Sequence, residues 1–178
     1  DGDLVGKGIR SARRKGHYSK TSSWTKTIQG SYTGIDGLKV GGSITMNDAP
    51  KADVAGVAQD PVGVTLTEFN GTYYKNNIYG RMEYGMLDYT NNVVNGEEVT
   101  SGNGYYLDLG YNIADLVGCD GDMFVWTRTS NYTRDDVESV DISLFGLTYK
   151  PLENVSFKFE LGEDGGSDVM RFGLGYMF

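Results

Sequence analysis

Bulky apolar side chains recur at every second position in the last stretch of the chain. The alternating set comprises Met170, Phe172, Leu174, Tyr176 and Phe178, and the positions between them include Arg171, Gly173 and Gly175. A period of two predicts a β-strand with two unlike faces. Chain termini of water-soluble domains usually tolerate polar residues and fray. An aromatic face that continues to the last residue therefore favours a strand whose apolar side meets lipid.

The same alternation starts again near residue 24. Trp24, Lys26, Ile28, Gly30 and Tyr32 share one face of a predicted strand, and polar residues fill the other. Asp36-Gly37 is a strong signal for a tight hairpin turn. The returning strand, 38–47, is expected to place alternate residues outward and inward; the outward set is Val40, Gly42, Ile44 and Met46, and the inward set is Lys39, Gly41, Ser43, Thr45 and Asn47.

This rhythm continues to the end of the chain and predicts about nine strands of roughly ten residues. The expected strands are 24–32, 38–47, 63–74, 78–89, 103–113, 122–132, 140–150, 155–161 and 168–178. Short turns are expected at 34–37, 75–77, 116–121 and 151–154. On the other side, a long connection is expected at 48–62, a polar loop at 90–102, a short acidic loop at 135–139, and a connection to the final strand at 162–167. All the short turns then fall on one side of the meander.

The strand length and the asymmetry of the connections favour a transmembrane β-barrel. Strands of 9–11 residues cross a bilayer when tilted, with short turns on one side and long loops on the other. Aromatic residues at strand ends would form the interfacial girdle: Trp24, Tyr32, Tyr73, Tyr105, Tyr111, Tyr149 and Phe178. The alternative is a soluble β-sandwich, which alternates in the same way but with shorter strands and no fixed asymmetry of its turns.

Residues 1–23 follow a different pattern, without a clear period. Arg10, Arg13, Arg14 and Lys15 form a basic cluster. We expect the end of an earlier strand, about 4–9, followed by a long exposed loop. Three interpretations stay open: a solvated loop, a nucleic-acid patch, or a loop that folds into a barrel and sets anion preference.

Composition narrows the function without fixing it. The 178 residues include 26 Gly and 13 Tyr, the formal net charge is -8, and the mean hydropathy is -0.38. Residues 1–178 fit one all-β domain. The acidic balance argues against a nucleic-acid partner. Apolar runs of the length of a transmembrane helix do not occur. The first residue is Asp and no signal peptide is visible, so we expect a processed form or a fragment.

Three stretches resemble one family of membrane proteins: 32–42 (YTGIDGLKVGG), 145–160 (FGLTYKPLENVSFKFE) and 172–178 (FGLGYMF). Together they resemble the C-terminal portion of a bacterial outer-membrane porin of the general or phosphate-selective type. The final strand is also similar to the insertion signal of such barrels, through Arg171, Gly173, Tyr176 and Phe178.

The resemblance implies an antiparallel up-and-down barrel of 16 to 18 strands in the outer membrane of a Gram-negative bacterium. It further implies a homotrimer that passes small hydrophilic solutes or ions passively. The final strand would engage the barrel-assembly machinery. The chain departs from the family because it supplies only nine or ten strands, whereas bacterial single-chain barrels have even numbers. We expect either a tenth strand within 1–10 or, preferably, the C-terminal part of a longer polypeptide.

The inward positions of the predicted strands carry charges of both signs. The expected pore-lining residues are Lys39, Glu68, Arg81, Glu83, Asp108, Arg128, Lys158, Glu160 and Arg171. We predict that Arg81, Arg128, Lys158 and Arg171 form one basic wall, which with an opposed acidic wall would select ions by charge. The alternative is that these charges pair and fill a small closed barrel with a structural or adhesion role.

An enzyme and a metal site are not expected. His17 is the only histidine, and it has no Ser or carboxylate at a recognisable spacing for nucleophilic catalysis. Asp120, Asp122, Glu163 and Asp164 are acidic but match no calcium loop, so we interpret them as solvated turns. The single Cys119 lacks partners for zinc or a disulfide. No cofactor is predicted. Beside the channel and the structural barrel, a soluble β-sandwich binding module remains an alternative function.

Overall fold

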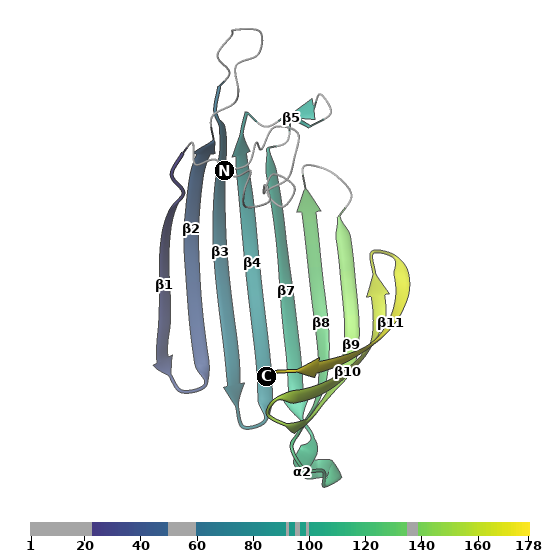
Figure 1. Cartoon of the computed structure of the whole chain (residues 1–178). Coiled ribbons are helices and arrows are strands. Elements are labelled where there is room, and N and C mark those ends of the chain that lie inside the picture. The colour runs from purple at the N-terminus through teal and green to yellow at the C-terminus, as the bar shows by residue number, and fades with distance from the viewer. Residues whose placement is uncertain (1–22, 50–59, 92, 95–96, 99, 135–138) are drawn as a thin grey trace.

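The chain forms one large antiparallel sheet in a computed structural model that describes residues 23–49, 60–91, 93–94, 97–98, 100–134 and 139–178 (Figure 1). Nine strands lie in the order in which they occur along the chain, so each pairs with its sequence neighbours. They are β1 (Lys26–Ile35), β2 (Leu38–Ala49), β3 (Val62–Lys75), β4 (Ile78–Thr90), β7 (Ser101–Asn112), β8 (Asp122–Arg134), β9 (Val140–Leu152), β10 (Val155–Asp164) and β11 (Ser167–Tyr176). The expected all-β, up-and-down meander is confirmed for the described residues.

The tight turns have the backbone conformation that their sequences predict. Asn76 and Asn77, between β3 and β4, have φ of 53° and 65°, and Gly37, between β1 and β2, has φ of 80°. Two successive left-handed residues make a turn whose twist matches that of the flanking strands. The two turns also contact each other, because Tyr74 N donates to Gly37 O at 2.8 Å and Lys75 Nζ lies 3.0 Å from Asp36 Oδ2.

Several predicted connections were wrong in detail. The turn expected at 116–121 contains a short helix, α2 (Ala114–Val117), which ends at Gly118 in the left-handed conformation. The polar loop expected at 90–102 contains a two-stranded ladder of β5 (Val93–Val94) and β6 (Glu97–Glu98). No helix in the described part of the chain is long and apolar enough to cross a membrane.

The C-terminal hairpin also differs from the prediction. β10 continues to Asp164 and β11 starts at Ser167, so the loop expected at 162–167 is a tight turn at Gly165-Gly166, both with positive φ. This turn lies at the end of the sheet where only long loops were expected. β11 ends at Tyr176, so Phe178 lies beyond the sheet; the last backbone contact is Met177 N to Asn154 O, 2.9 Å.

The alternation of the sequence becomes two faces of the sheet. Cross-strand partners lie on the same face, and the register pairs Ile28 with Ile44, Phe69 with Tyr84, and Phe159 with Phe172. We call this side the apolar face. The opposite side, the ionic face, carries pairs such as Asp108 with Arg128 and Glu160 with Arg171. The predicted period of two is therefore confirmed over the described strands.

The apolar face is not covered by any other described part of the chain. Ile28, Phe69 and Phe172 are 73%, 55% and 72% exposed. The buried hydrophobic residues of the described ranges are only Val62, Ala114 and Leu144. A β-sandwich buries one face of each sheet against a second sheet about 10 Å away. Apart from the small β5–β6 ladder, the described residues contain no such second sheet.

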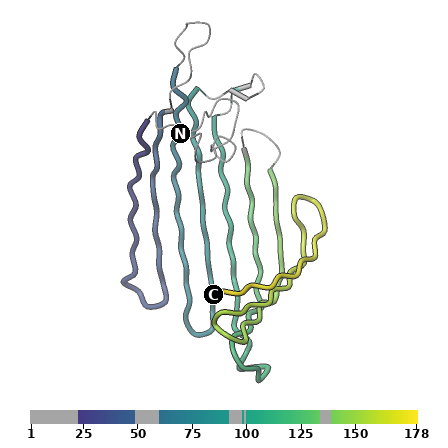
Figure 2. Tube along the Cα trace, in the orientation of Figure 1, coloured from purple at the N-terminus to yellow at the C-terminus, as the bar shows by residue number. Residues whose placement is uncertain are grey.

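The sheet is staggered and curved but not closed. The row of partners that starts at Leu38, beside the β1–β2 turn, climbs steadily through Tyr73, Gly80, Leu109, Thr127 and Phe145 to Leu161. Leu161 lies near the opposite end of β10, so the strands shift in one direction throughout. Figure 2 shows the β10–β11 hairpin turning across the lower part of the sheet. Among the described residues, β1 and β11 each pair on one side only.

Some predictions lie outside the described residues. They include the tenth strand at 4–9, the whole of 1–22 with its basic cluster, and most of the loop at 135–139. The strand count that the structure establishes is therefore nine for the main sheet of the described part.

We predict that Gly146→Ala destabilises the sheet by about 1–3 kcal/mol, because a Cβ at this position on the ionic face would collide with the Trp126 ring. Urea unfolding followed by circular dichroism measures the effect. Gly85→Ala is the matched control, since a Cβ there meets nothing within 4 Å. Equal unfolding midpoints for the two variants would show that Trp126 does not occupy the space above Gly146.

Candidate functional site

All nine residues predicted to line an interior lie on the ionic face. The register joins them across β2, β3, β4, β7, β8, β10 and β11, for example through Arg81 opposite Asp108 and Asp108 opposite Arg128. Alternation along a strand and pairing between strands leave no other arrangement once the register is known. The predicted set is Lys39, Glu68, Arg81, Glu83, Asp108, Arg128, Lys158, Glu160 and Arg171.

The central contact of the ionic face is the pair between Arg128 on β8 and Asp108 on β7. Arg128 Nε donates to Asp108 Oδ1 at 2.5 Å, and Nη2 donates to Oδ2 at 2.6 Å. Asp108 is only 6% exposed. Two parallel charge-assisted bonds fix both the distance and the plane of the guanidinium group. The pair therefore ties two neighbouring strands together by side chains as well as by the backbone.

Tyr106 connects this pair to a second one on β4. Its hydroxyl donates to Glu83 Oε2 at 3.0 Å, and Arg81 Nη2 lies 3.8 Å from the same oxygen. The guanidinium carbons of Arg81 and Arg128 lie 5.3 and 5.4 Å from the centre of the Tyr106 ring. Both distances suit cation–π attraction. The ring therefore lies within reach of both arginines.

Glu160 on β10 forms ion pairs with Lys158 and Arg171. Lys158 Nζ lies 2.6 Å from Glu160 Oε2, and Arg171 Nη1 donates to Oε1 at 3.2 Å. Arg171 also reaches Asp164 Oδ2 at 2.5 Å. Oε2 has no well-directed hydrogen bond, so the close ammonium group holds it by charge. Since Glu160 is 7% exposed, these partners offset the cost of removing its carboxylate from water.

The prediction of a separate basic wall was wrong in its charge pattern. Arg81, Arg128, Lys158 and Arg171 do lie on one face, but each is paired with a carboxylate on its own or an adjacent strand. The charges pair because two kinds of neighbour lie close enough for contact: side chains opposite or diagonal on adjacent strands, and long side chains two residues apart on the same face of one strand. The charges form a network of alternating sign and not two facing walls.

The two residues on the opposite half of the sheet have different surroundings. Glu68 accepts from Ser43 Oγ at 3.1 Å and from Asn70 Nδ2 at 2.7 Å. Lys39 is exposed on β2 and belongs to no ion pair among the described residues. This half of the ionic face is thus polar and sparsely charged, whereas the half from β4 to β11 carries the network.

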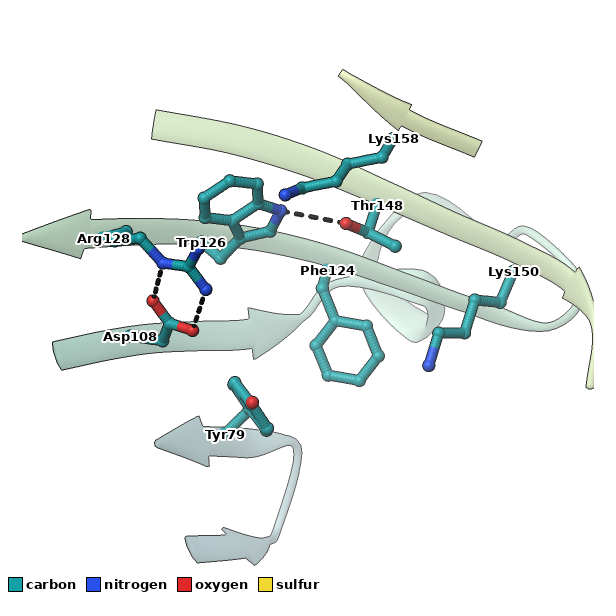
Figure 3. Close-up of a pocket in the computed structure, with 8 residues that line it drawn as sticks. All are labelled: Tyr79, Asp108, Phe124, Trp126, Arg128, Thr148, Lys150 and Lys158. Atoms are coloured by element: carbon teal, nitrogen blue, oxygen red, sulfur yellow. Dashed lines mark hydrogen bonds and ion pairs between the residues drawn. The ribbon is translucent and has the colours of Figure 1, made fainter. Parts of the chain in front are cut away.

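Sequence reasoning missed a cavity on the ionic face (Figure 3). It has a volume of about 240 Å³ and is lined by Tyr79, Asp108, Phe124, Trp126, Arg128, Thr148, Lys150 and Lys158. Lys158 lies on β10 and Tyr79 on β4, with three strands between them, so the sheet curves toward this face. The signal in the sequence was the presence of Phe124 and Trp126 at inward positions of β8, beside the charged Arg128.

The acidic residues and the cysteine of the turns form no metal-binding cluster in the described part of the chain. Asp122 Oδ1 accepts from Asn112 Nδ2 at 2.7 Å, and Asn112 Oδ1 accepts from the backbone N–H of Ala114 and Met123, so this carboxylate organises the α2 turn. Within the described ranges no group of three or more His, Cys, Asp or Glu residues is placed to share a metal ion. His17 lies outside those ranges.

The four residues of the predicted insertion signal do not form one cluster; they make different contacts. Arg171 joins the ionic network, and Gly173 lies opposite Lys158 on β10. The rings of Tyr176 and Phe178 pack edge to face with their centres 5.0 Å apart.

Comparisons with models of known protein families, with curated proteins and with solved structures gave no match.

We predict that Arg128→Met lowers the free energy of unfolding by about 3 kcal/mol, because it leaves the Asp108 carboxylate buried without its cation. Arg81→Met is the control and should cost about 1 kcal/mol or less, since Arg81 is half exposed and 3.8 Å from its partner. Urea unfolding gives both values. Adding Asp108→Leu to Arg128→Met should recover part of the loss; strict additivity of the two changes would contradict the pairing.

Proposed function

We propose that this sheet is part of the wall of an outer-membrane β-barrel of the porin type, which passes small hydrophilic solutes or ions by diffusion. The observation that carries the proposal is the distribution of polarity between the two faces. The exposed apolar face suits lipid, and the charged face suits a water-filled interior. The likeness of 32–42, 145–160 and 172–178 to porins points the same way.

The apolar face has the charge distribution that a bilayer requires. Its middle carries no charged side chain in the described strands, as the run from Phe69 through Tyr84 to Tyr105 illustrates. Its charges lie at the strand ends opposite the β1–β2 turn, and they are Lys26, Asp48, Asp88, Asp141, Glu163 and Asp168. Lys75 lies at the other end of the strands, beside its turn. Arg or Lys at the bilayer midplane costs about 2–4 kcal/mol and much less at the interface. This pattern supports a lipid-facing belt.

The free edges of β1 and β11 indicate how the sheet would be completed. An unpaired edge in lipid leaves backbone N–H and C=O groups without partners, and each such group costs several kcal/mol. The steady stagger of the strands is what closure into a barrel requires. Because nine is an odd number and both edges are open, the proposal includes further strands that pair with β1 and β11.

The other properties implied by the porin likeness belong to the same proposal. They are a barrel of 16 to 18 strands, a homotrimer, and recognition of the last strand by the barrel-assembly machinery. The exposed apolar residues of β11 support the last point, since Phe172 and Leu174 are 72% and 66% exposed and available to a docking partner or to lipid.

The membrane part of the proposal is tested by moving one charge between the two faces of β3. Phe69→Arg puts a cation in the middle of the apolar face and should reduce folding into phospholipid vesicles by about 2–4 kcal/mol. Asn70→Arg, one residue away on the ionic face and beside Glu68, should fold like the unaltered protein. The folded fraction is read from heat-modifiable migration on gels. A protein that stays in solution without detergent, or equal folding of the two variants, would point to the soluble alternative.

The channel part is tested by conductance in planar bilayers. Lys39→Glu reverses an exposed charge of the ionic face and should shift ion selectivity toward cations. Lys26→Glu changes the total charge equally but lies on the apolar face, so its selectivity should match that of the unaltered protein. Absence of single-channel steps in the unaltered protein would favour the alternative of a closed barrel filled by its paired charges.

A further inference from the structure

The aromatic cavity on the ionic face has a composition that a diffusion wall does not need. A wall that only conducts water and ions requires polar side chains, whereas this cavity is lined by the rings of Tyr79, Phe124 and Trp126. Two of the rings contact each other: Tyr79 and Phe124 pack edge to face with their centres 6.5 Å apart. Trp126 Nε1 donates to Thr148 Oγ1 on the neighbouring strand β9 at 2.9 Å, which fixes the orientation of the indole.

Cations lie over these rings. Lys158 Nζ is 4.5 Å from the centre of the Trp126 ring, and Lys150 Nζ is 5.9 Å from that of Phe124. Figure 3 shows both lysines extending from their strands toward the rings. Lys158 is already matched by Glu160, and Arg128 by Asp108. Lys150 has no ion pair among the described residues; Asp122, its partner in register, is bonded to Asn112.

We propose that this cavity binds a small organic anion in which a carboxylate is carried on a flat apolar ring. The aromatic side chains supply the surface for the ring, and Lys150 supplies the uncompensated charge for the carboxylate. An inorganic anion would leave the rings unused, and a neutral aromatic molecule would leave Lys150 unused. The inference rests on the proposed function, because the solute has to reach the ionic face through water.

The tryptophan in the cavity makes binding measurable without any channel activity. 4-Nitrobenzoate quenches tryptophan fluorescence on contact and has the proposed chemistry. It is titrated into the full protein in detergent. The 178 residues contain two tryptophans, so the titration uses the Trp24→Phe variant, in which Trp126 is the one tryptophan of this sequence that remains. We expect saturable quenching, with 4-nitrobenzamide, which lacks the charge, binding roughly fivefold more weakly. Propionate, which lacks the ring, should not compete.

Two variants separate the charge from the ring. Lys150→Met should weaken 4-nitrobenzoate binding roughly fivefold and leave 4-nitrobenzamide unaffected, whereas Lys26→Met, on the apolar face, should change neither. Phe124→Leu keeps an apolar side chain but removes a ring, and should weaken both ligands. Quenching that is linear in concentration, or equal for both ligands and insensitive to Lys150→Met, overturns the inference.

Failure of this inference and failure of the channel are distinguishable. Saturable binding in a protein that shows no conductance would remove the diffusion function and keep the cavity as a ligand site. Conductance without saturable binding would keep the channel and remove the ligand.

Discussion

Backbone hydrogen bonds between neighbouring strands hold this sheet together and position every side chain on it. The described residues bury hardly any large hydrophobic side chains, so no hydrophobic core holds the strands together. Within the main sheet, the seven strands between β1 and β11 are each paired on both sides, and strands that are neighbours in the sheet follow one another along the chain. In a single sheet of this kind, the outer sides of the two edge strands present backbone N–H and C=O groups that have no partner strand.

The hydrogen-bond ladder also decides where the side chains go. Because alternate residues point to opposite faces, one register produces an apolar face and an ionic face together. A shift of β8 by one residue would turn all its side chains to the other face and place Arg128 on the apolar face, opposite Leu107 or Leu109 of β7. The paired carboxylates of the ionic face, above all Asp108, therefore support the register as well as the stability of the sheet.

The relation of sequence to structure differs between the sheet and its site. The period of two, the Asp36-Gly37 and Asn76-Asn77 turns and the placement of the nine charged residues on one common face were all readable from local patterns, and the described strands follow them. Strand ends were placed less well: Gly162 was expected in a loop but lies in β10, since pairing with β9 and β11 extends a strand past its apolar residues. The α2 turn depends on the side chain of Asn112, whose contacts no periodicity reveals.

Local patterns along the chain were enough to predict the two faces, the order of the strands and most of the tight turns, because these features depend on sequence neighbours and on the alternation of side chains. The pairing of the cations with carboxylates became visible only in three dimensions, because such contacts depend on the register between strands, which no local pattern encodes. The same holds for the meeting of Tyr79, Trp126 and Lys158 at one cavity, because that requires the curvature of the whole sheet.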